Sequence, residues 1–234
     1  MVYGLIISAG RQSRFKSAVP KCLSMIDGKT LLDRNIDAMR PYCDKIYTVC
    51  SVENQNYFDK YDKIVIESGK GSGDAVWQAI ERIGCYEDDL CFIMWGDALH
   101  TEDIFAKLQS NYRGRALIPC KWEKLPYVKV SQDKSHTLKV YFSKFHEDTR
   151  EGFHDLSLFY CPMCALLNKL RQFRNKILRP DGTYRHKHGD EMEFMDLFNE
   201  TDVEAEILEC NDYEDFSFNT VEELQKLTEQ KSRR

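Results

Sequence analysis

The sequence has no apolar run long enough to cross a membrane. Hydrophobic residues make up 42% of its 234 positions, but the longest runs fall far short of the roughly 20 residues that a spanning helix needs. The stretch from Met1 to Ser8 has the pattern of a buried strand and carries no basic segment like the one that opens a secretion signal. We therefore expect a cytoplasmic protein with no membrane partner.

An excess of positive charge is also missing, because the formal net charge is -5. Proteins that coat nucleic acids carry the opposite balance, so no nucleic-acid partner is expected, although local basic clusters can still hold single phosphates. No internal repeat or low-complexity linker divides the chain. We predict one domain over residues 1–230 and a disordered basic tail over 231–234.

The nine cysteines are odd in number and scattered, and several, such as Cys50 and Cys91, lie within apolar runs. A thiol in such a run behaves as a small hydrophobic side chain, so we expect the cysteines to be reduced. Cys161 and Cys164 with His186 and His188 form a possible zinc-ligand set. The histidine spacing does not match a zinc finger, and zinc is not expected.

Short apolar runs alternate with amphipathic stretches through the first half of the chain, the pattern of strand-helix-strand units around a mainly parallel sheet. The predicted strands are 2–8, 45–50, 63–66 and 90–95, and the predicted helices are 30–39 and 74–83. From about Arg115 onward the sequence favours β-strands, which are predicted at 128–130, 138–142 and 156–160. Helices are predicted after them at 165–173, 191–198 and 219–230. The fold class is a single Rossmann-like, three-layer α/β domain with a mixed, mainly parallel sheet and a β-rich insertion.

The loop after the first predicted strand reads Ser8-Ala9-Gly10-Arg11-Gln12-Ser13-Arg14-Phe15-Lys16, with Pro20-Lys21 downstream. Small residues at the end of a strand let main-chain N–H groups approach an anion, and the basic side chains add charge. The loop has the chemistry of a triphosphate cradle, although it matches neither the Walker P-loop nor the GxGxxG fingerprint. A solvated basic turn is the alternative.

Two further segments lie where a parallel sheet places its sites. The run from Ser68 to Ala75 contains Gly71-Ser72-Gly73, whose backbone could pack against a flat ring; an ordinary strand-to-helix turn is the alternative. Asp97 follows the apolar strand at 90–95, so its carboxylate is expected at the carboxyl end of that strand. A hard oxygen ligand there suits Mg²⁺.

The loop from Ile7 to Phe15, with Pro20-Lys21, resembles the signature of the sugar-phosphate nucleotidyltransferases, and most closely their N-acetylglucosamine-1-phosphate uridylyltransferase domain. The resemblance implies a GT-A-like fold and a catalytic role for Arg11, Arg14 and Lys21. Gln12 departs from the small residue common in that family. The nucleotide-binding residues that it implies are Ser8, Ala9, Gly10, Gln12, Ser13, Glu67, Gly71, Ser72, Gly73 and Asp97. It also implies that Asp97 and Asn219 hold Mg²⁺, while Asn219 is equally read as the N-cap of the last helix.

The same resemblance assigns the β-rich insertion to the acceptor. The implied acceptor-binding residues are Tyr127, Lys144, Glu191 and Asp196. Glu191 and Asp196 are alternatively the solvated face of a helix. The basic run from Arg185 to His188 is read either as a site for the acceptor's phosphate or as an exposed loop.

The predicted function is transfer of a nucleoside monophosphate from a nucleoside triphosphate to a sugar phosphate, with release of pyrophosphate. UTP and CTP are both favoured, and the sequence leaves open the base, the acceptor and the oligomeric state, a homodimer included. Two rival readings remain: a cytidylyltransferase acting on a non-sugar phosphorylated small molecule, and a catalytically silent nucleotide-binding regulatory module. A glycosyltransferase is disfavoured because no DxD-type acidic pair accompanies Asp97.

Overall fold

The structure is a computed structural model that describes residues 1–10, 19–67, 70–214 and 216–217. Several predictions fall on residues outside these ranges. They are the roles of Arg11, Gln12, Ser13, Arg14 and Asn219, the helix over 219–230 and the tail over 231–234.

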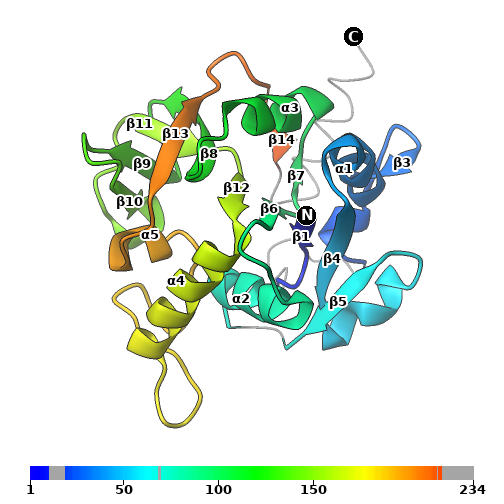
Figure 1. The fold of residues 1–234 in the computed structure, drawn as a ribbon, viewed down its shortest axis with the longest axis horizontal. Helices are drawn as coiled ribbons and strands as arrows, with labels where there is room; N and C mark the ends of the chain where they lie inside the picture. Colours follow the sequence, from blue (N-terminus) through cyan, green and yellow to red (C-terminus); the bar gives the residue numbers. More distant parts are fainter. Residues whose placement is uncertain (11–18, 68–69, 215, 218–234) are drawn as a thin grey trace.

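Four parallel strands form one half of the main sheet. They are β1 (Val2–Ile7), β4 (Lys45–Ser51), β5 (Lys63–Ile66) and β6 (Leu90–Trp95), in the order β6-β1-β4-β5. Ile7 pairs with Trp95 across β1 and β6, so both strands end at the same edge of the sheet (Figure 1). The loops that follow them therefore start side by side.

The other half of the sheet comes from the β-rich segment. Its strands are β8 (Ala116–Glu123), β9 (Val128–Gln132), β10 (Leu138–Phe142), β11 (Gly152–Asp155), β12 (Leu158–Pro162) and β13 (Ala205–Glu209). β12 is antiparallel to both β6 and β8, so β8 runs in the same direction as β6. Leu117 of β8 pairs with β12, whereas its last four residues pair with β11. The β8–β11–β9–β10 part thus extends past the ends of β1 and β6 and forms a wall above them.

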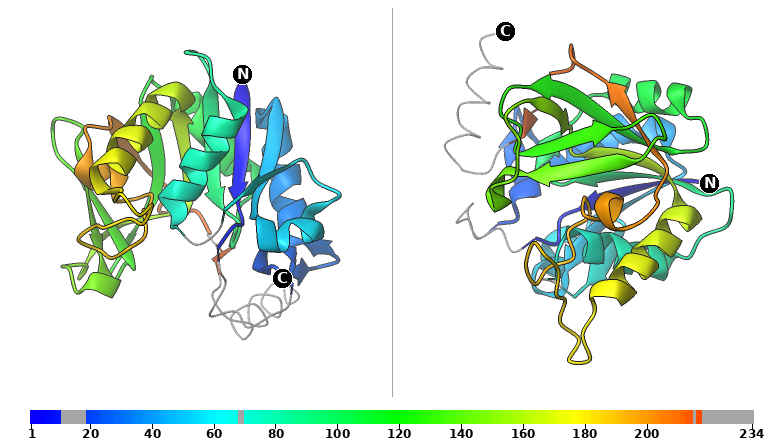
Figure 2. Two further views of the ribbon diagram at one scale, coloured as in Figure 1. Left: turned by 90° about the horizontal axis from the view of Figure 1, so that it is seen from below. Right: turned by 90° about the vertical axis from the view of Figure 1, so that its left-hand side faces the viewer.

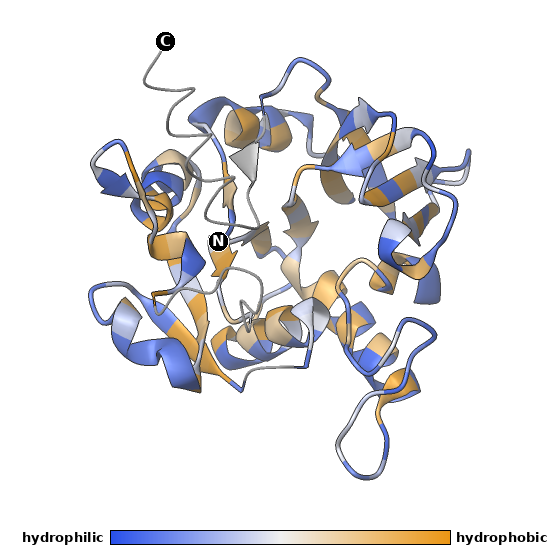
Figure 3. Ribbon diagram, turned by 180° about the vertical axis from the view of Figure 1, so that it is seen from behind, coloured by the Kyte–Doolittle hydropathy of each residue, from blue (hydrophilic) through white to orange (hydrophobic). Residues whose placement is uncertain are grey.

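Helices cover both faces of the sheet. α2 (Ser72–Ile83) and α4 (Met163–Ile177) pack on one face, and α1 (Leu31–Met39) and α3 (Glu102–Asn111) on the other (Figures 1 and 2). Because side chains alternate along a strand, Leu5 of β1 joins the core under α2 and α4, and Ile6 joins the core under α1 and α3. Figure 3 shows the hydrophobic strands enclosed by more polar outer segments. The mixed three-layer α/β architecture predicted from the sequence is confirmed.

Smaller elements complete the described chain. They are the short strands β2 (Met25–Ile26), β3 (Lys29–Thr30), β7 (Ala98–Leu99) and β14 (Phe216–Ser217), the helix α5 (Leu197–Glu200), and 3-10 turns at Lys21–Leu23, Arg40–Tyr42, Val52–Phe58 and Ser143–Phe145. The helix predicted over 191–198 is wrong, because α5 has four residues and begins only at Leu197. Met192 and Phe194 are buried while Glu191 and Glu193 are not, an alternation that is typical of extended chain.

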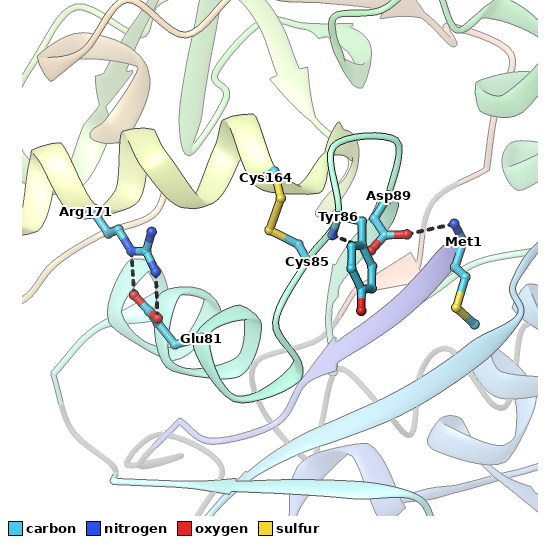
Figure 4. The surroundings of a disulfide bond; sticks show 7 residues. All are labelled: Met1, Glu81, Cys85, Tyr86, Asp89, Cys164 and Arg171. Atoms are coloured by element: carbon cyan, nitrogen blue, oxygen red, sulfur yellow. Dashed lines mark hydrogen bonds and ion pairs between the residues drawn. A yellow bond between two sulfur atoms is a disulfide. The ribbon is translucent and has the colours of Figure 1, made fainter.

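The expectation that every cysteine is reduced is also wrong. Cys85, just after α2, and Cys164, in the first turn of α4, form a disulfide with Cα atoms 5.6 Å apart (Figure 4). Farther along the same two helices, Arg171 donates to both carboxylate oxygens of Glu81 at 2.7 and 2.9 Å, and this pairing lowers the pKa of Glu81. The disulfide also removes Cys164 from the zinc-ligand set considered above, while Cys161 stays a buried thiol.

None of the helices in the part of the chain that the structure describes combines the length and the apolar character needed to cross a membrane.

Candidate nucleotide and acceptor site

A cavity of about 850 Å³ opens at the carboxyl ends of β1, β5 and β6, beneath the wall formed by the β-rich half. Its volume falls within the range typical of sites for small ligands. Residues predicted to bind nucleotide and residues predicted to bind acceptor both line it. From the first group these are Ser8, Ala9, Gly10, Glu67, Gly71, Ser72 and Asp97, and from the second Tyr127, Lys144 and Glu191; Lys21, predicted to be catalytic, lines it too.

The loop after β1 is held tightly against the loop after β6. The main-chain N–H of Ser8 donates to Val49 O at 2.8 Å, and that of Gly96 donates to Ile7 O at 2.9 Å. A Cβ at Gly96 would collide with Oγ of Ser8. A residue without a side chain is therefore needed at position 96, and it brings Asp97 beside the start of the Ser8-Ala9-Gly10 loop.

Lys21 and Asp97 meet at the floor of the cavity. Nζ of Lys21 lies 2.9 Å from Oδ2 of Asp97, and the Lys21 side chain is only 9% exposed whereas that of Asp97 is 40% exposed. Lys21 begins a 3-10 turn directly after Pro20, which fixes its approach to the cavity. The two residues are 76 positions apart in the sequence, yet the structure brings their charges together.

The turn before α2 forms one side of the cavity. Gly71 has φ +101°, a conformation that other residues rarely adopt, and an added Cβ would lie 2.5 Å from Met192 O. Gly73 does not line the cavity, because its N–H donates to Met192 O at 2.7 Å and it packs against that residue. Lys70, outside the predicted set, lines the cavity and pairs with Glu67 at 3.3 Å.

The opposite side of the cavity is lined by acidic and aromatic residues. Glu193 is held in place from two directions: Ser72 donates to its Oε2 at 3.0 Å, and Lys144 donates to its Oε1 at 2.5 Å. Ser72 also accepts a hydrogen bond from the N–H of Phe194 at 2.9 Å. Glu193 therefore links the turn before α2 to the acceptor side, and it was not among the predicted site residues.

Asp196 is a correction to the predicted site. Its side chain is 0% exposed and does not line the cavity; it contacts His188 at 2.8 Å and His186 at 3.2 Å, so an acceptor in the cavity cannot reach it. Burial raises the pKa of its carboxyl group. The two histidines are only 5% exposed, so they neither form an exposed loop nor face the cavity.

Sequence reasoning missed other lining residues as well. They are Lys70, Trp95, Phe142, His154, Asp155, Ser157 and Glu193. For Glu193 a signal existed, because the alternation Glu191-Met192-Glu193-Phe194 indicates an extended segment with both glutamates on one face. Lys70 and Trp95 lie close to predicted site residues in the sequence, whereas Phe142, His154, Asp155 and Ser157 depend on how the β-rich half lies over the central strands, which the local sequence does not specify.

Cys22 borders the cavity beside Lys21, and burial raises the pKa of its thiol to about 12. A thiolate is the nucleophilic form of cysteine, so at neutral pH this side chain is inert. Burial therefore makes Cys22 a poor nucleophile, and the charged groups that line the cavity are the better candidates for its chemistry.

A family model described as a MobA-like NTP transferase domain matches residues 4–159, which include β1, the turn before α2, and Asp97. The chain belongs to this family. Among curated relatives, a bifunctional protein GlmU of Buchnera aphidicola is 22% identical over 223 residues, a match that covers 89% of this chain and 46% of the relative. A second GlmU, from Ruthia magnifica, is 27% identical over 107 residues and is matched over 22% of its length. The chain thus spans less than half of these relatives.

Two solved structures share the fold over nearly all of the chain. The inositol-1-phosphate CTP transferase of T. maritima superposes with a TM-score of 0.73 at 14% identity, covering 98% of this chain and 94% of the other. HddC of Yersinia pseudotuberculosis, complexed with GMP-PN, gives a TM-score of 0.70 at 15% identity, covering 98% and 99%. At such identities the likeness shows a common fold, and this transferase domain is similar to both.

Proposed function

We propose that the chain transfers a nucleoside monophosphate from a nucleoside triphosphate, UTP or CTP, to a sugar phosphate, and releases pyrophosphate. The observation that carries the proposal is the ion pair of Lys21 and Asp97 at the floor of one cavity. On one side of that cavity lies the glycine turn before α2, and on the other lie the acidic and aromatic residues described above. A buried ammonium next to a partly exposed carboxylate is suited to bind a phosphate together with its metal.

The chemistry is an in-line displacement at the α-phosphorus. An oxygen of the acceptor's phosphate forms the new bond to the α-phosphorus, the bond to the bridging oxygen breaks, and pyrophosphate leaves with that electron pair. The acceptor phosphate is already ionised, so no general base is required. Catalysis then reduces to positioning and to neutralising the charge of two anions. Lys21 supplies one positive charge, and Arg11 and Arg14 are proposed to supply others.

Asp97 is proposed to hold Mg²⁺, with Asn219 as a second ligand. The carboxylate suits this role, since it stands at the carboxyl end of β6, is 40% exposed and offers a hard oxygen donor. Such an ion would neutralise charge on the phosphates and orient them. Mg²⁺ keeps several waters and takes only one or two protein oxygens, so a site with few protein ligands is sufficient.

The base and the acceptor are proposed to lie on opposite sides of the cavity. Gly71 and Ser72 would face the base, since their backbone approaches the cavity without a bulky side chain. Tyr127, Lys144, Glu191 and Glu193 would face the acceptor: glutamates can accept hydrogen bonds from sugar hydroxyls, and the Lys144 ammonium can approach a phosphate.

The test is a panel of the four ribonucleoside triphosphates against sugar phosphates, read by pyrophosphate release with and without Mg²⁺. We expect release only when triphosphate, acceptor and metal are all present, with UTP or CTP preferred. A protein that binds triphosphate but releases no pyrophosphate with any acceptor would instead be a silent nucleotide-binding module.

The metal role of Asp97 has its own test. We expect Asp97→Asn to raise the Mg²⁺ concentration needed for half-maximal rate and to lower kcat, because the neutral amide is a weaker ligand for a hard cation. Asp37→Asn, which removes an exposed carboxylate paired with Lys29 on α1, is the matched control and should leave both unchanged. An unchanged Mg²⁺ dependence in Asp97→Asn contradicts the assignment.

A second candidate is a cytidylyltransferase for a non-sugar phosphorylated molecule. The acidic and aromatic wall favours it, because Asp155, Glu191 and Glu193 near Trp95 and Tyr127 are also suited to a cationic group. Adding phosphorylated amino alcohols and polyol phosphates to the acceptor panel separates the two candidates. If the second candidate is right, one of these acceptors gives a higher kcat/KM than every sugar phosphate.

A further inference from the structure

A cluster of two histidines and three carboxylates lies outside the cavity. His186 and His188 follow α4, and Asp196 is the N-cap residue of α5. One potential ligand atom from each of these three residues lies within 4.8 Å of the other two. The histidine side chains are 5% exposed and the aspartate 0% exposed, so the cluster is built into the fold.

Each imidazole is held between two carboxylates. Nδ1 of His188 lies 2.8 Å from Oδ1 of Asp196, and Nδ1 of His186 lies 3.2 Å from Oδ2 of the same aspartate. On the far side of the rings, Nε2 of His186 is 3.2 Å from Glu200 and Nε2 of His188 is 3.2 Å from Glu147. Histidines that bind a metal commonly donate their second N–H to a carboxylate in this way.

The hydrogen bonds around His186 leave two acceptors facing each other. The main-chain N–H of His188 donates to Nδ1 of His186 at 3.4 Å, so this nitrogen is assigned a lone pair and the proton is assigned to Nε2, beside Glu200. Among the described residues, no donor makes a hydrogen bond to the buried Oδ2 of Asp196, 3.2 Å away from that lone pair. A cation between the two atoms would satisfy Oδ2, and it would take the single lone pair of Nδ1 in place of the long contact with the His188 N–H.

We propose that His186, His188 and Asp196 bind one divalent transition-metal ion of the zinc class. Two imidazole nitrogens and one carboxylate oxygen suit Zn²⁺, whereas Mg²⁺ prefers an all-oxygen environment. Ligand atoms about 2.1 Å from a tetrahedral zinc stand roughly 3.3 Å from one another. Nδ1 of His188 lies 2.8 Å from Oδ1 of Asp196 and Nδ1 of His186 lies 3.2 Å from Oδ2, so the side chains need to move only slightly apart to admit the ion.

The surroundings assign this site a structural role. The ring of Phe145 stacks on His188 with centroids 4.2 Å apart, and Phe173 packs edge-on against His186 at 5.5 Å, which leaves no room for a substrate. The ion would fasten the segment that carries Glu191 and Glu193 of the cavity. Glu147, the outer partner of His188, follows the turn that carries Lys144. The site does not depend on the proposed transferase activity.

The test uses tag-free full-length protein, freed of metal by a chelator and then titrated with zinc alone. We expect one zinc per chain by calorimetry and native mass spectrometry, together with a higher melting temperature. His188→Gln and Asp196→Asn should lose this binding. His136→Asn is the matched control, because His136 is a half-buried histidine outside the cluster whose φ of +61° asparagine tolerates.

Two further measurements keep the test decisive if a ligand variant fails to fold. Glu200→Gln leaves all three ligands in place and should weaken zinc binding by about 10- to 100-fold. Cobalt(II) should give the visible spectrum of nitrogen and oxygen ligation, without a thiolate charge-transfer band. The proposal is overturned if the wild type takes up no zinc, because the cluster is then a network of protonated imidazoles and carboxylates. It is also overturned if the ligand variants bind zinc as tightly as the wild type, or if the cobalt spectrum shows a thiolate band.

Discussion

The charges at the floor of the cavity balance each other. Lys21 is 9% exposed, so its ammonium has little contact with water, and the carboxylate of Asp97 2.9 Å away offsets the cost of burying it. A triphosphate entering the cavity offers the ammonium new anionic partners. At the scale of single residues, the site is thus preorganised to exchange an internal ion pair for contacts with phosphate.

For Lys21→Ala we predict a fall in kcat of about 100- to 1000-fold, the usual cost of losing one positioned group that stabilises transition-state charge. The measurement is pyrophosphate release at saturating substrates. Lys29→Ala, which removes a lysine whose side chain is 60% exposed, is the control and should keep the wild-type rate. A near-normal rate in a folded Lys21→Ala variant would remove Lys21 from the mechanism.

Among the elements, the turn before α2 and the extended segment around Met192 form one unit. The N–H of Gly73 donates to Met192 O at 2.7 Å, and the N–H of Met192 donates to Lys70 O at 2.9 Å. Ser72 adds the bond to Glu193. The side of the cavity proposed to face the base and the side proposed to face the acceptor are therefore coupled through main-chain contacts.

Gly71→Ala should destabilise the protein more than Gly182→Ala. Both glycines have positive φ, +101° and +81°, so both substitutions introduce backbone strain, but only at Gly71 would the new Cβ meet a neighbour. We expect about 2 kcal/mol or more of additional destabilisation at Gly71 from this overlap. Urea unfolding of the two variants measures the difference, and equal losses would show that Met192 moves away at no cost.

Across the whole molecule, the disulfide of Cys85 and Cys164 joins positions 79 residues apart and fastens α2 to α4. These helices cover one face of the sheet, and β6 and every strand of the β-rich half except β13 lie between them in the sequence. A cross-link over such a distance restricts the unfolded chain far more than the folded one. Its effect is therefore expected on global stability rather than on the cavity.

Reduction of this bond should lower the free energy of unfolding by up to about 4.5 kcal/mol, the chain-entropy estimate for a loop of this length. The melting temperature should fall by about 10 °C. The double variant Cys85→Ser, Cys164→Ser should melt at the lower temperature with or without reductant, while Cys43→Ser, which alters a free thiol, should stay reductant-sensitive like the wild type. If the melting temperature of the wild type does not change when reductant is added, the prediction is contradicted.

Much of the parallel half could be predicted because its signals are local. The strands at 63–66 and 90–95 and the strand at 138–142 match the structure residue for residue, since each is a short apolar or alternating run with clear ends. The strands β8 and β13 and the helix α3 were not anticipated. The helix predicted over 191–198 is wrong because the alternation of apolar and acidic residues there has the period of an extended chain rather than that of a helix.

The sequence by itself determined the α/β class and the position of Asp97 at a strand end, because each follows from short contiguous runs. Only the tertiary structure decided which distant side chains meet. It paired Lys21 with Asp97, set Glu193 rather than Asp196 in the cavity, joined Cys85 to Cys164, and enclosed His186 and His188 around Asp196. Such contacts depend on sheet order and on how the β-rich wall folds over the central strands, and no local pattern encodes that arrangement.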